Sequence, residues 1–166
     1  MMPSHFFWKT NLEYYMGSIF SSVDLMDVAL AEARAGVDEG GMPFGSVLFL
    51  DGAVVSRAHN RQLQDADYFA HAEMECLKKY INIGGRRVDG AVLVATEAPC
   101  PMCAGAAVIL GIRKFVIGES YHYQGALDWL MTQEVEVEVL DHKGCIDLVS
   151  EFRINHADRW SKFSAG

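Results

Sequence analysis

The sequence lacks the features that mark membrane-bound and exported proteins. It has no run of about eighteen apolar residues that would cross a bilayer. Its N-terminus has no basic region that leads into a short apolar stretch and a small-residue cleavage site. It also has no internal repeat, low-complexity tract or linker. At 166 residues and 51% hydrophobic composition, the chain suits one compact domain with a substantial core. We therefore expect a cytoplasmic protein with no membrane partner.

Basic residues are in short supply as well. The chain has 14 Lys and Arg against 22 Asp and Glu, which gives a formal charge of −8. Such a charge repels a phosphate backbone unless a local patch is basic. The basic clusters, Lys78-Lys79 and Arg86-Arg87, are both short. We expect a small free substrate and no nucleic-acid partner.

Cysteine is scarce, and its spacing excludes two common uses. Cys100 and Cys103 form a Cys-x-x-Cys pair, whereas Cys76 and Cys145 stand alone. A structural zinc site needs a second ligand pair, which these spacings do not provide. A redox dithiol leaves the histidine and the acid upstream of the pair without a role. We expect no disulfide, and we expect Cys76 and Cys145 to be small buried apolar residues.

The segments His71-Ala72-Glu73 and Pro99-Cys100-Pro101-Met102-Cys103 predict a catalytic zinc site. One imidazole and two thiolates leave the fourth tetrahedral position to a water molecule. Glu73 is not a ligand. It stands two residues after the ligating histidine, where it can carry the proton of a water whose pKa zinc lowers. The pattern His-x-Glu followed by Pro-Cys-x-x-Cys is typical of zinc-dependent nucleobase deaminases.

Hydrophobic periodicity and turn signals predict the fold. Ser21 and Asp24 resemble a capping box that opens a helix ending at Gly40-Gly41. Asp51-Gly52 between two apolar runs predicts a hairpin. This alternation favours an α/β fold, a three-layer α/β/α sandwich around a mixed, mostly parallel five-stranded sheet. The predicted strands cover 45–50, 53–56, 91–95, 114–118 and 135–140, and the later helices begin near residues 71, 102, 126 and 145.

The predicted helix starts explain the spacing of the metal ligands. Pro99 suits the first turn of a helix, although it precedes the helix proper by a residue or two. The positive end of that helix stabilises the two thiolates. His71 and Glu73 lie on the first turn of their own helix. Two helix starts that face each other would hold zinc between them.

From about Leu25 to Trp160 the chain resembles the cytidine deaminase-like superfamily, and it is most similar to the small fungal-type cytosine deaminases. The resemblance implies zinc on His71, Cys100 and Cys103 and a general acid/base at Glu73. It leaves an aromatic-rich N-terminal arm at 1–20 ahead of a zinc-dependent deaminase domain at 21–166. The matching stretches are Glu39–Gly45, His59-Asn60, His71–Glu73, Pro99–Gly105 and Ile117–Glu119.

The resemblance also implies a set of substrate contacts. Asn60 would bond a pyrimidine carbonyl and ring N–H, although an Asn after the second strand also suits a turn. Tyr123 stands at an aromatic lid position and Trp160 at a C-terminal position that covers the base, and both also suit ordinary packing. Ala72 and Cys100 complete the predicted site, with the Cys100 N–H aimed at the developing oxyanion. His122 and His156 are expected to be structural, because three protein ligands suffice.

Two departures from the family pattern affect the base. Members that deaminate cytosine carry an acid three positions after the C-terminal Trp, where this chain has Phe163. Asp158 is nearby and is predicted to join the substrate site. Relatives have Ser or Glu before the first proline of the Cys-x-x-Cys segment, whereas here Ala98 holds that position and Glu97 stands one step earlier.

These observations predict hydrolysis of free cytosine to uracil and ammonia in pyrimidine salvage. A second hypothesis is deamination of guanine or another aminated ring such as a triazine or pterin. A third is tRNA adenosine deamination, which the charge disfavours. A fourth is a non-catalytic zinc-bearing subunit, and Glu73 argues against it. The resemblance and the apolar helix at Ala106–Leu110 together predict a homodimer.

Overall fold

The structure is a computed structural model that describes residues 20–86 and 88–164. The predicted N-terminal arm, apart from Phe20, therefore lies outside the described residues. Among the described residues, no helix is both long and apolar enough to span a bilayer. The elements, in chain order, are α2 (Ser22–Asp38), β1 (Gly45–Leu50), β2 (Ala53–His59), α3 (Gln62–Asp65), α4 (Ala72–Asn82), β3 (Val92–Glu97), α5 (Pro101–Ile109), β4 (Lys114–Glu119), α6 (Leu127–Leu130), β5 (Glu136–Val139), α7 (Lys143–Asn155) and α8 (Ala157–Ser164).

The five strands form one sheet in the order β2-β1-β3-β4-β5. β1 is antiparallel to β2 and to β3, while β3, β4 and β5 are parallel to one another. β1 alone therefore runs against the others, and the predicted mixed five-stranded sheet is confirmed. The predicted hairpin is confirmed as well. Asp51 and Gly52 have φ angles of 51° and 81°, which are the left-handed values of a type I′ turn.

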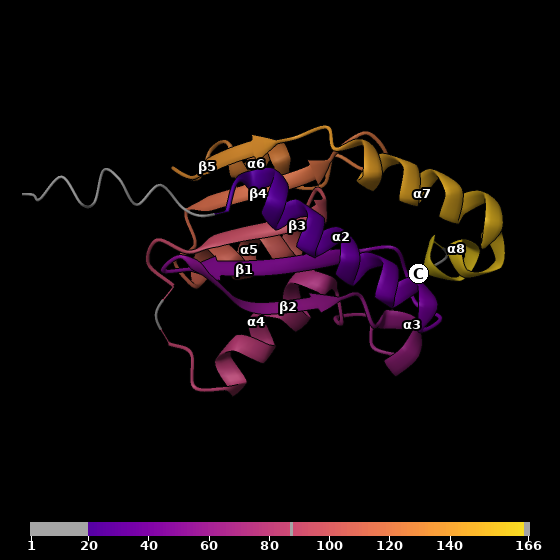
Figure 1. Cartoon of the computed structure of the whole chain (residues 1–166), viewed down its shortest axis with the longest axis horizontal. Helices are drawn as coiled ribbons and strands as arrows, with labels where there is room; N and C mark the ends of the chain where they lie inside the picture. Colours follow the sequence, from indigo (N-terminus) through magenta and orange to yellow (C-terminus); the bar gives the residue numbers. More distant parts are fainter. Residues whose placement is uncertain (1–19, 87, 165–166) are drawn as a thin grey trace, which may run out of the picture.

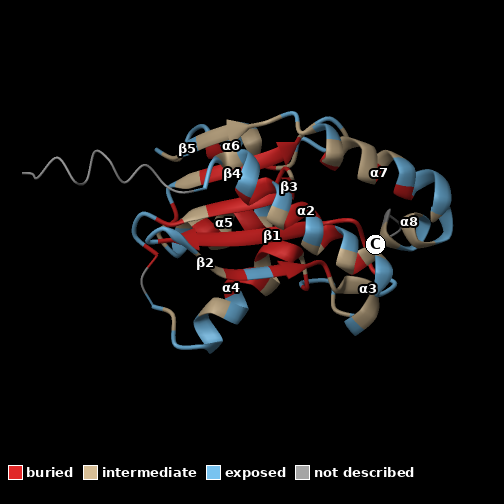
Figure 2. Ribbon diagram, viewed as in Figure 1, coloured by how far each residue is buried: buried red, intermediate tan, exposed pale blue. Residues whose placement is uncertain are grey.

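Helices cover both faces of the sheet, as the three-layer prediction requires (Figure 1). α4, α5 and α6 pack on one face through a core that includes Leu77, Ala107 and Leu130. α2 and α7 pack on the other face, where Met26 and Cys145 contact the sheet. Figure 2 shows that the central strands are buried while the outer faces of the helices are exposed. Burial of apolar side chains on both faces of the central strands supplies most of the driving force for this packing.

Local signals fixed the ends of α2 as predicted. The Asp24 N–H donates to Ser21 Oγ at 3.1 Å, and the Ser21 N–H donates to Asp24 Oδ2 at 2.8 Å, which completes the capping box. The two isolated cysteines, Cys76 and Cys145, are buried and free, as expected. Burial raises the pKa of each thiol to about 12, so both are unreactive at neutral pH.

Three features differ from the sequence expectations. Sequence patterns did not reveal the short helix α3 or the C-terminal helix α8. β3 extends to Glu97, which places this acid at the carboxyl end of a central strand. Open α/β sheets bind ligands at this edge. α8 packs there against a third apolar cluster, which includes Met42, Phe44 and Phe152.

Candidate active site

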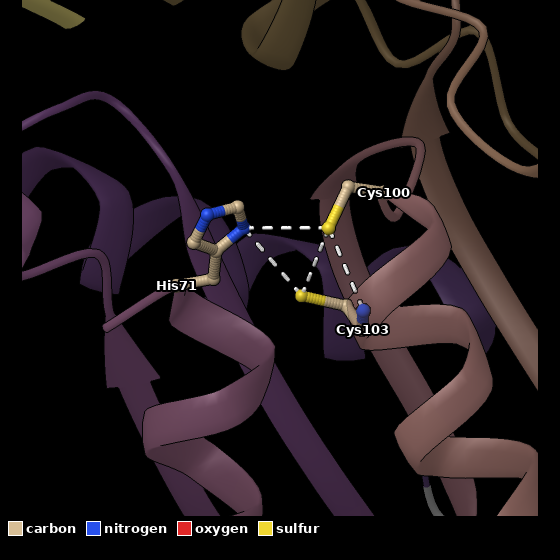
Figure 3. Close-up of side chains that lie close together, drawn as sticks. All are labelled: His71, Cys100 and Cys103. Carbon is tan, nitrogen blue, oxygen red and sulfur yellow. Dashed lines mark hydrogen bonds between the residues drawn. The ribbon is translucent and has the colours of Figure 1, made fainter. Parts of the chain in front are cut away.

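The predicted zinc ligands come together between two helix N-termini (Figure 3). His71 is the N-cap residue of α4 and Cys100 is the N-cap residue of α5. The Nδ1 atom of His71 lies 3.6 Å from Cys100 Sγ and 3.5 Å from Cys103 Sγ. The two sulfur atoms are 3.5 Å apart.

These separations fit a tetrahedral zinc ion. Zn–S bonds of about 2.3 Å and Zn–N bonds of about 2.0–2.1 Å at tetrahedral angles place the donor atoms roughly 3.5–3.8 Å apart. The chemistry of the donors fits too, because one imidazole and two thiolates suit zinc and leave one position open. His71, Cys100 and Cys103 are therefore the zinc site of this protein.

The start of α5 explains why its cysteines ligate well. Pro101 occupies the first helical position, and Pro99 precedes the helix by two residues, as expected. Pro99 instead accepts a hydrogen bond at its carbonyl from the Ala126 N–H at 2.9 Å. The Cys103 thiol and the His71 ring lie against the Cys100 sulfur, and they hold the pKa of Cys100 at about 4. The Cys103 N–H also points at that sulfur. Hydrogen bonding to the charged Cys100 raises the pKa of the Cys103 thiol in the metal-free arrangement.

Glu73 lies beside this site on the first turn of α4. Glu73 is only 8% exposed, and it lines the cavity next to the zinc ligands. Burial raises the pKa of its carboxyl above the usual range. A carboxyl group in this position can exchange protons with a reacting molecule without access to bulk water.

A cavity of about 310 Å³ opens from the zinc ligands toward α8. It brings together six of the predicted substrate and catalytic residues, but Asp158 is not among them. Asp158 is exposed on α8, because the helix turns this position toward solvent. The acid expected to replace the missing contact therefore does not reach the cavity. The cavity is lined by Phe44, Gly45, Asn60, His71, Ala72, Glu73, Ala95, Thr96, Glu97, Ala98, Cys100, His122, Tyr123, Trp160 and Phe163.

Asn60 closes the turn after β2, which is one of the two uses that its sequence position suggested. The Gln62 N–H donates to Asn60 Oδ1 at 3.0 Å, and Asn60 Nδ2 donates to Gln62 Oε1 at 2.7 Å. These bonds close the turn after β2 and orient the side-chain amide at the cavity wall. Asn60 is 2% exposed and lines the cavity.

Aromatic side chains cover the cavity on the side of α8. Trp160 and Phe163 pack together with ring centroids 5.8 Å apart, and Phe163 also contacts Phe44. Tyr123 follows β4 and is 44% exposed at the rim. An apolar ring thus stands where the family pattern has an acid, and it extends the apolar wall of the cavity.

Sequence reasoning assigned no role to Glu119, at the end of β4. Glu119 is fully buried and accepts hydrogen bonds from the Tyr121 N–H at 2.6 Å and the His122 N–H at 3.0 Å. The His122 ring joins Glu119 Oε1 to Ser150 Oγ, both at 3.0 Å, so this histidine is structural, as expected, although it also lines the cavity. Glu119 ends a matching stretch of the family pattern, which was the available signal.

A three-ligand zinc site at the carboxyl edge of a mixed sheet, with a buried carboxyl beside it, defines a zinc-dependent hydrolase. Residues 21–119 match the family model of the cytidine and deoxycytidylate deaminase zinc-binding region. The chain therefore belongs to this family of zinc-dependent deaminases, as its sequence motifs indicated.

Relatives in this family differ in their substrates. The chain is 31% identical over 138 residues to cytosine deaminase from Candida albicans, which covers 82% of this chain and 92% of the relative. It is 34% identical over 119 residues to tRNA-specific adenosine deaminase from Bacillus subtilis, covering 71% and 73%. A solved structure of guanine deaminase from Nitrosomonas europaea superposes with a TM-score of 0.73 at 20% identity, covering 82% and 86%. This last likeness shows that the fold is shared.

Proposed function

We propose that the protein hydrolyses the exocyclic amine of a free heterocyclic base and releases ammonia. The observation that carries the proposal is the small cavity, in which Glu73 and Asn60 lie beside the zinc ligands under an aromatic cover. Such a cavity suits a flat aromatic ring, because its walls are largely apolar and its few polar groups can fix the orientation of a ligand.

The residues suggest a division of roles. Zinc, when bound, lowers the pKa of a water molecule toward neutrality and so makes it a nucleophile. Glu73 accepts the two protons of the attacking water in turn, passing the first to the ring nitrogen and the second to the departing amine. The Cys100 N–H, at the start of α5, donates to the oxygen that gains negative charge. A C–O bond forms, the C–N bond breaks, and the products are a ring carbonyl and ammonia.

Cytosine is the first candidate substrate. The relationship to a cytosine deaminase over 82% of the chain supports it, and Asn60 can bond a ring carbonyl and the adjacent N–H of cytosine. Rim residues such as Tyr123 disfavour cytidine, because its ribose collides with them. The net charge of −8 disfavours tRNA.

A ring with an additional polar edge, such as guanine or a diaminotriazine, is the second candidate. The Glu97 carboxyl, at the end of β3, adds a further polar group to the cavity lining. In cytosine, one polar group is the leaving amine and the carbonyl with its N–H contacts Asn60. No polar group then remains to contact the Glu97 carboxyl.

Ammonia release from a panel of cytosine, guanine, adenine, cytidine and a tRNA anticodon stem tests the proposal. We expect measurable turnover of cytosine or guanine as free bases, and little turnover of cytidine or the RNA. Turnover of the anticodon stem above that of every free base would contradict the proposal. If none of the five compounds releases ammonia, free nucleobases are excluded as substrates.

A further inference from the structure

Glu119 is a buried carboxyl group that does not line the cavity but contacts segments that do. It ends β4 and is fully buried. Its Oε2 atom accepts from the backbone N–H of Tyr121 at 2.6 Å and from that of His122 at 3.0 Å. Its other oxygen, Oε1, lies 3.0 Å from Nδ1 of the His122 ring. One carboxyl group therefore fixes both backbone and side chain of the segment that follows β4.

Glu97, at the end of the neighbouring strand β3, supplies a further contact. Glu97 and Glu119 are paired in register, and their carboxyl groups are hydrogen-bonded to each other. Burial, and next the charge of Glu119, raise the pKa of Glu97 to about 9, so Glu97 keeps its proton and is the donor of this bond. The Ala98 N–H also donates to the Glu119 carbonyl at 2.9 Å. These bonds fix Glu119 against the strand end that leads to the zinc ligand Cys100.

The His122 ring connects the Glu119 carboxyl to α7. Its Nε2 atom lies 3.0 Å from the hydroxyl oxygen of Ser150, and its side chain is only 6% exposed. With the carboxyl at Nδ1 and the hydroxyl at Nε2, both ring nitrogens have a partner. The ring is held at both ends, so the chain of Glu119, His122 and Ser150 joins the end of β4 to α7.

The segment 120–126 is attached at its far end as well. The Ala126 N–H donates to the carbonyl of Pro99 at 2.9 Å. Gly125 has a φ of 53°, and a Cβ atom added there would lie 2.4 Å from the same carbonyl oxygen, so glycine permits this close approach. Tyr123 lies between the two attachment points and lines the cavity. Its position therefore depends on how firmly the segment is held.

We propose that Glu119 and Ser150 are positioning residues for the substrate. They act through the His122 ring, which holds the segment 120–126, and so place Tyr123 against the bound base. The inference rests on the proposed deamination and adds two residues that act on its site. A buried carboxylate costs more to fold than an apolar side chain in the same place. The hydrogen bonds that offset this cost all go to segments that line the cavity, which is what the carboxylate provides.

Ser150→Ala removes the hydroxyl at one end of the chain, and Ser150 does not line the cavity. For the free base that the wild-type protein turns over fastest, we expect KM to rise ~3- to 10-fold, the equivalent of one hydrogen bond, and kcat to stay within about twofold. Ser150→Thr keeps the hydroxyl and should restore KM. Ser22→Ala is the matched control, because the Ser22 hydroxyl donates to Glu138 Oε2 at 2.7 Å, between α2 and β5 and outside the cavity lining.

Glu119→Gln tests the other end of the chain. The amide keeps the size of the side chain but replaces one acceptor oxygen with a donor, so a contact with the backbone, with His122 or with Glu97 is lost. We expect KM to rise at least as much as in Ser150→Ala, and an unchanged KM would contradict the role of Glu119. If Glu119→Gln does not fold, the comparison of Ser150→Ala with Ser150→Thr decides.

Tyr123→Ala tests whether the chain acts through Tyr123. This variant should raise KM by itself, because it removes a ring from the cavity wall. If Ser150 acts by positioning that ring, adding Ser150→Ala to Tyr123→Ala should change KM by less than about twofold further. Full additivity of the two effects would overturn the inference, because Ser150 would then act on the substrate by another route.

Hydrogen exchange of the Tyr121 and His122 amides, measured without substrate, gives a readout that does not depend on turnover. Ser150→Ala should speed this exchange and Ser22→Ala should not. Unchanged exchange, or faster exchange with an unchanged KM, overturns the inference while base deamination stands. Joint loss of kcat and zinc in Ser150→Ala indicates a structural role and overturns it as well. A wild-type protein that deaminates no base of the panel refutes the proposed function, and this inference with it.

Discussion

The Nδ1 atom of His71 lies 3.5 Å from the Sγ atom of Cys103, although 32 residues separate them in the sequence. The two side chains meet because α4 and α5 begin at the same edge of the sheet, with their N-termini side by side (Figure 3). Zinc bound here would link the segments that begin α4 and α5. Its binding would stabilise the folded protein in addition to the packing of the core.

Zinc should be present at about one ion per chain, and its removal should inactivate and destabilise the protein. Cys103→Ala removes one of the three zinc ligands. The remaining two cannot hold the ion, so we expect loss of bound zinc and of turnover. Cys76→Ala is the control, because this buried thiol lies outside the zinc site. Elemental analysis and thermal unfolding provide the measurement. A Cys103→Ala protein with full zinc content contradicts the ligand assignment.

Glu73→Gln should retain zinc and fold but lose most of its activity. The amide keeps the size of the side chain and cannot accept a proton, and general acid–base catalysis typically supplies ~10²–10⁴-fold. Single-turnover rates on the best free base, alongside zinc content, measure the effect. If more than about a tenth of the rate survives, another group moves the proton.

Glu97 should make the protein less stable as the pH rises. Its pKa is about 4.5 in an unfolded chain and about 9 in the folded one, chiefly because it is buried and next because Glu119 is charged. Below the lower value both states are protonated and folding carries no penalty. Between the two values only the unfolded state releases the proton, so the free energy of unfolding falls with pH, by on the order of 3 kcal/mol at pH 7.

Glu97→Gln removes this titration while the nearby charged groups Glu73, Glu119 and Arg153 stay. Urea unfolding of the variant and of the wild-type protein should agree at about pH 4.5 and diverge up to about pH 9 in favour of the variant. A difference that does not depend on pH would show that Glu97 does not titrate in this range.

The sequence sufficed for elements whose signals are local. The capping box of Ser21 and Asp24 and the Asp51-Gly52 turn each depend on a few adjacent residues, and the zinc ligands stand in two short motifs; all three are confirmed. Backbone geometry at such positions follows from the residue types alone.

Features that depend on tertiary contacts escaped the sequence. α8 is a short, polar helix whose apolar residues, Trp160 and Phe163, acquire a buried face only against Phe44 and Phe152. The exposure of Asp158 follows from the rotation of that helix and not from its position in the chain. The raised pKa of Glu97 depends in part on the strand register that pairs it with Glu119, and sequence patterns do not specify which strands are neighbours.

The protein should form a homodimer through α5. Ile109 is 86% exposed on this helix, beside the partly exposed Leu110, and a second copy would cover them. Ile109→Glu should shift the population to monomers in light scattering at micromolar concentration. Ile154→Glu is the control, because Ile154 is 79% exposed on α7, on the other side of the sheet. A monomeric wild-type protein, or equal effects of the two variants, would contradict this interface.

Arg159 should determine how well α8 closes the cavity. Its Nη1 atom donates to the carbonyls of Val37 at 3.0 Å and Gly41 at 3.1 Å, which attaches α8 to the end of α2. Hydrogen bonds from a charged group contribute about 1.5–3 kcal/mol, and without them Trp160 loses its fixed position over the cavity. Because α8 covers the cavity without contributing a proton-transfer group, Arg159→Ala should raise KM for the base several-fold and change kcat less.

Lys162→Ala on the same helix is the control for Arg159, because the Lys162 side chain is exposed and its loss leaves the attachment of α8 intact. Hydrogen exchange of residues 157–164 provides a second readout, independent of activity. Faster exchange there, together with a raised KM and unchanged zinc content, is the expected result for Arg159→Ala. Faster exchange with an unchanged KM would mean that α8 is attached through Arg159 but does not hold the substrate, and the aromatic cover of the cavity would then be attributed to Tyr123, which also lines it.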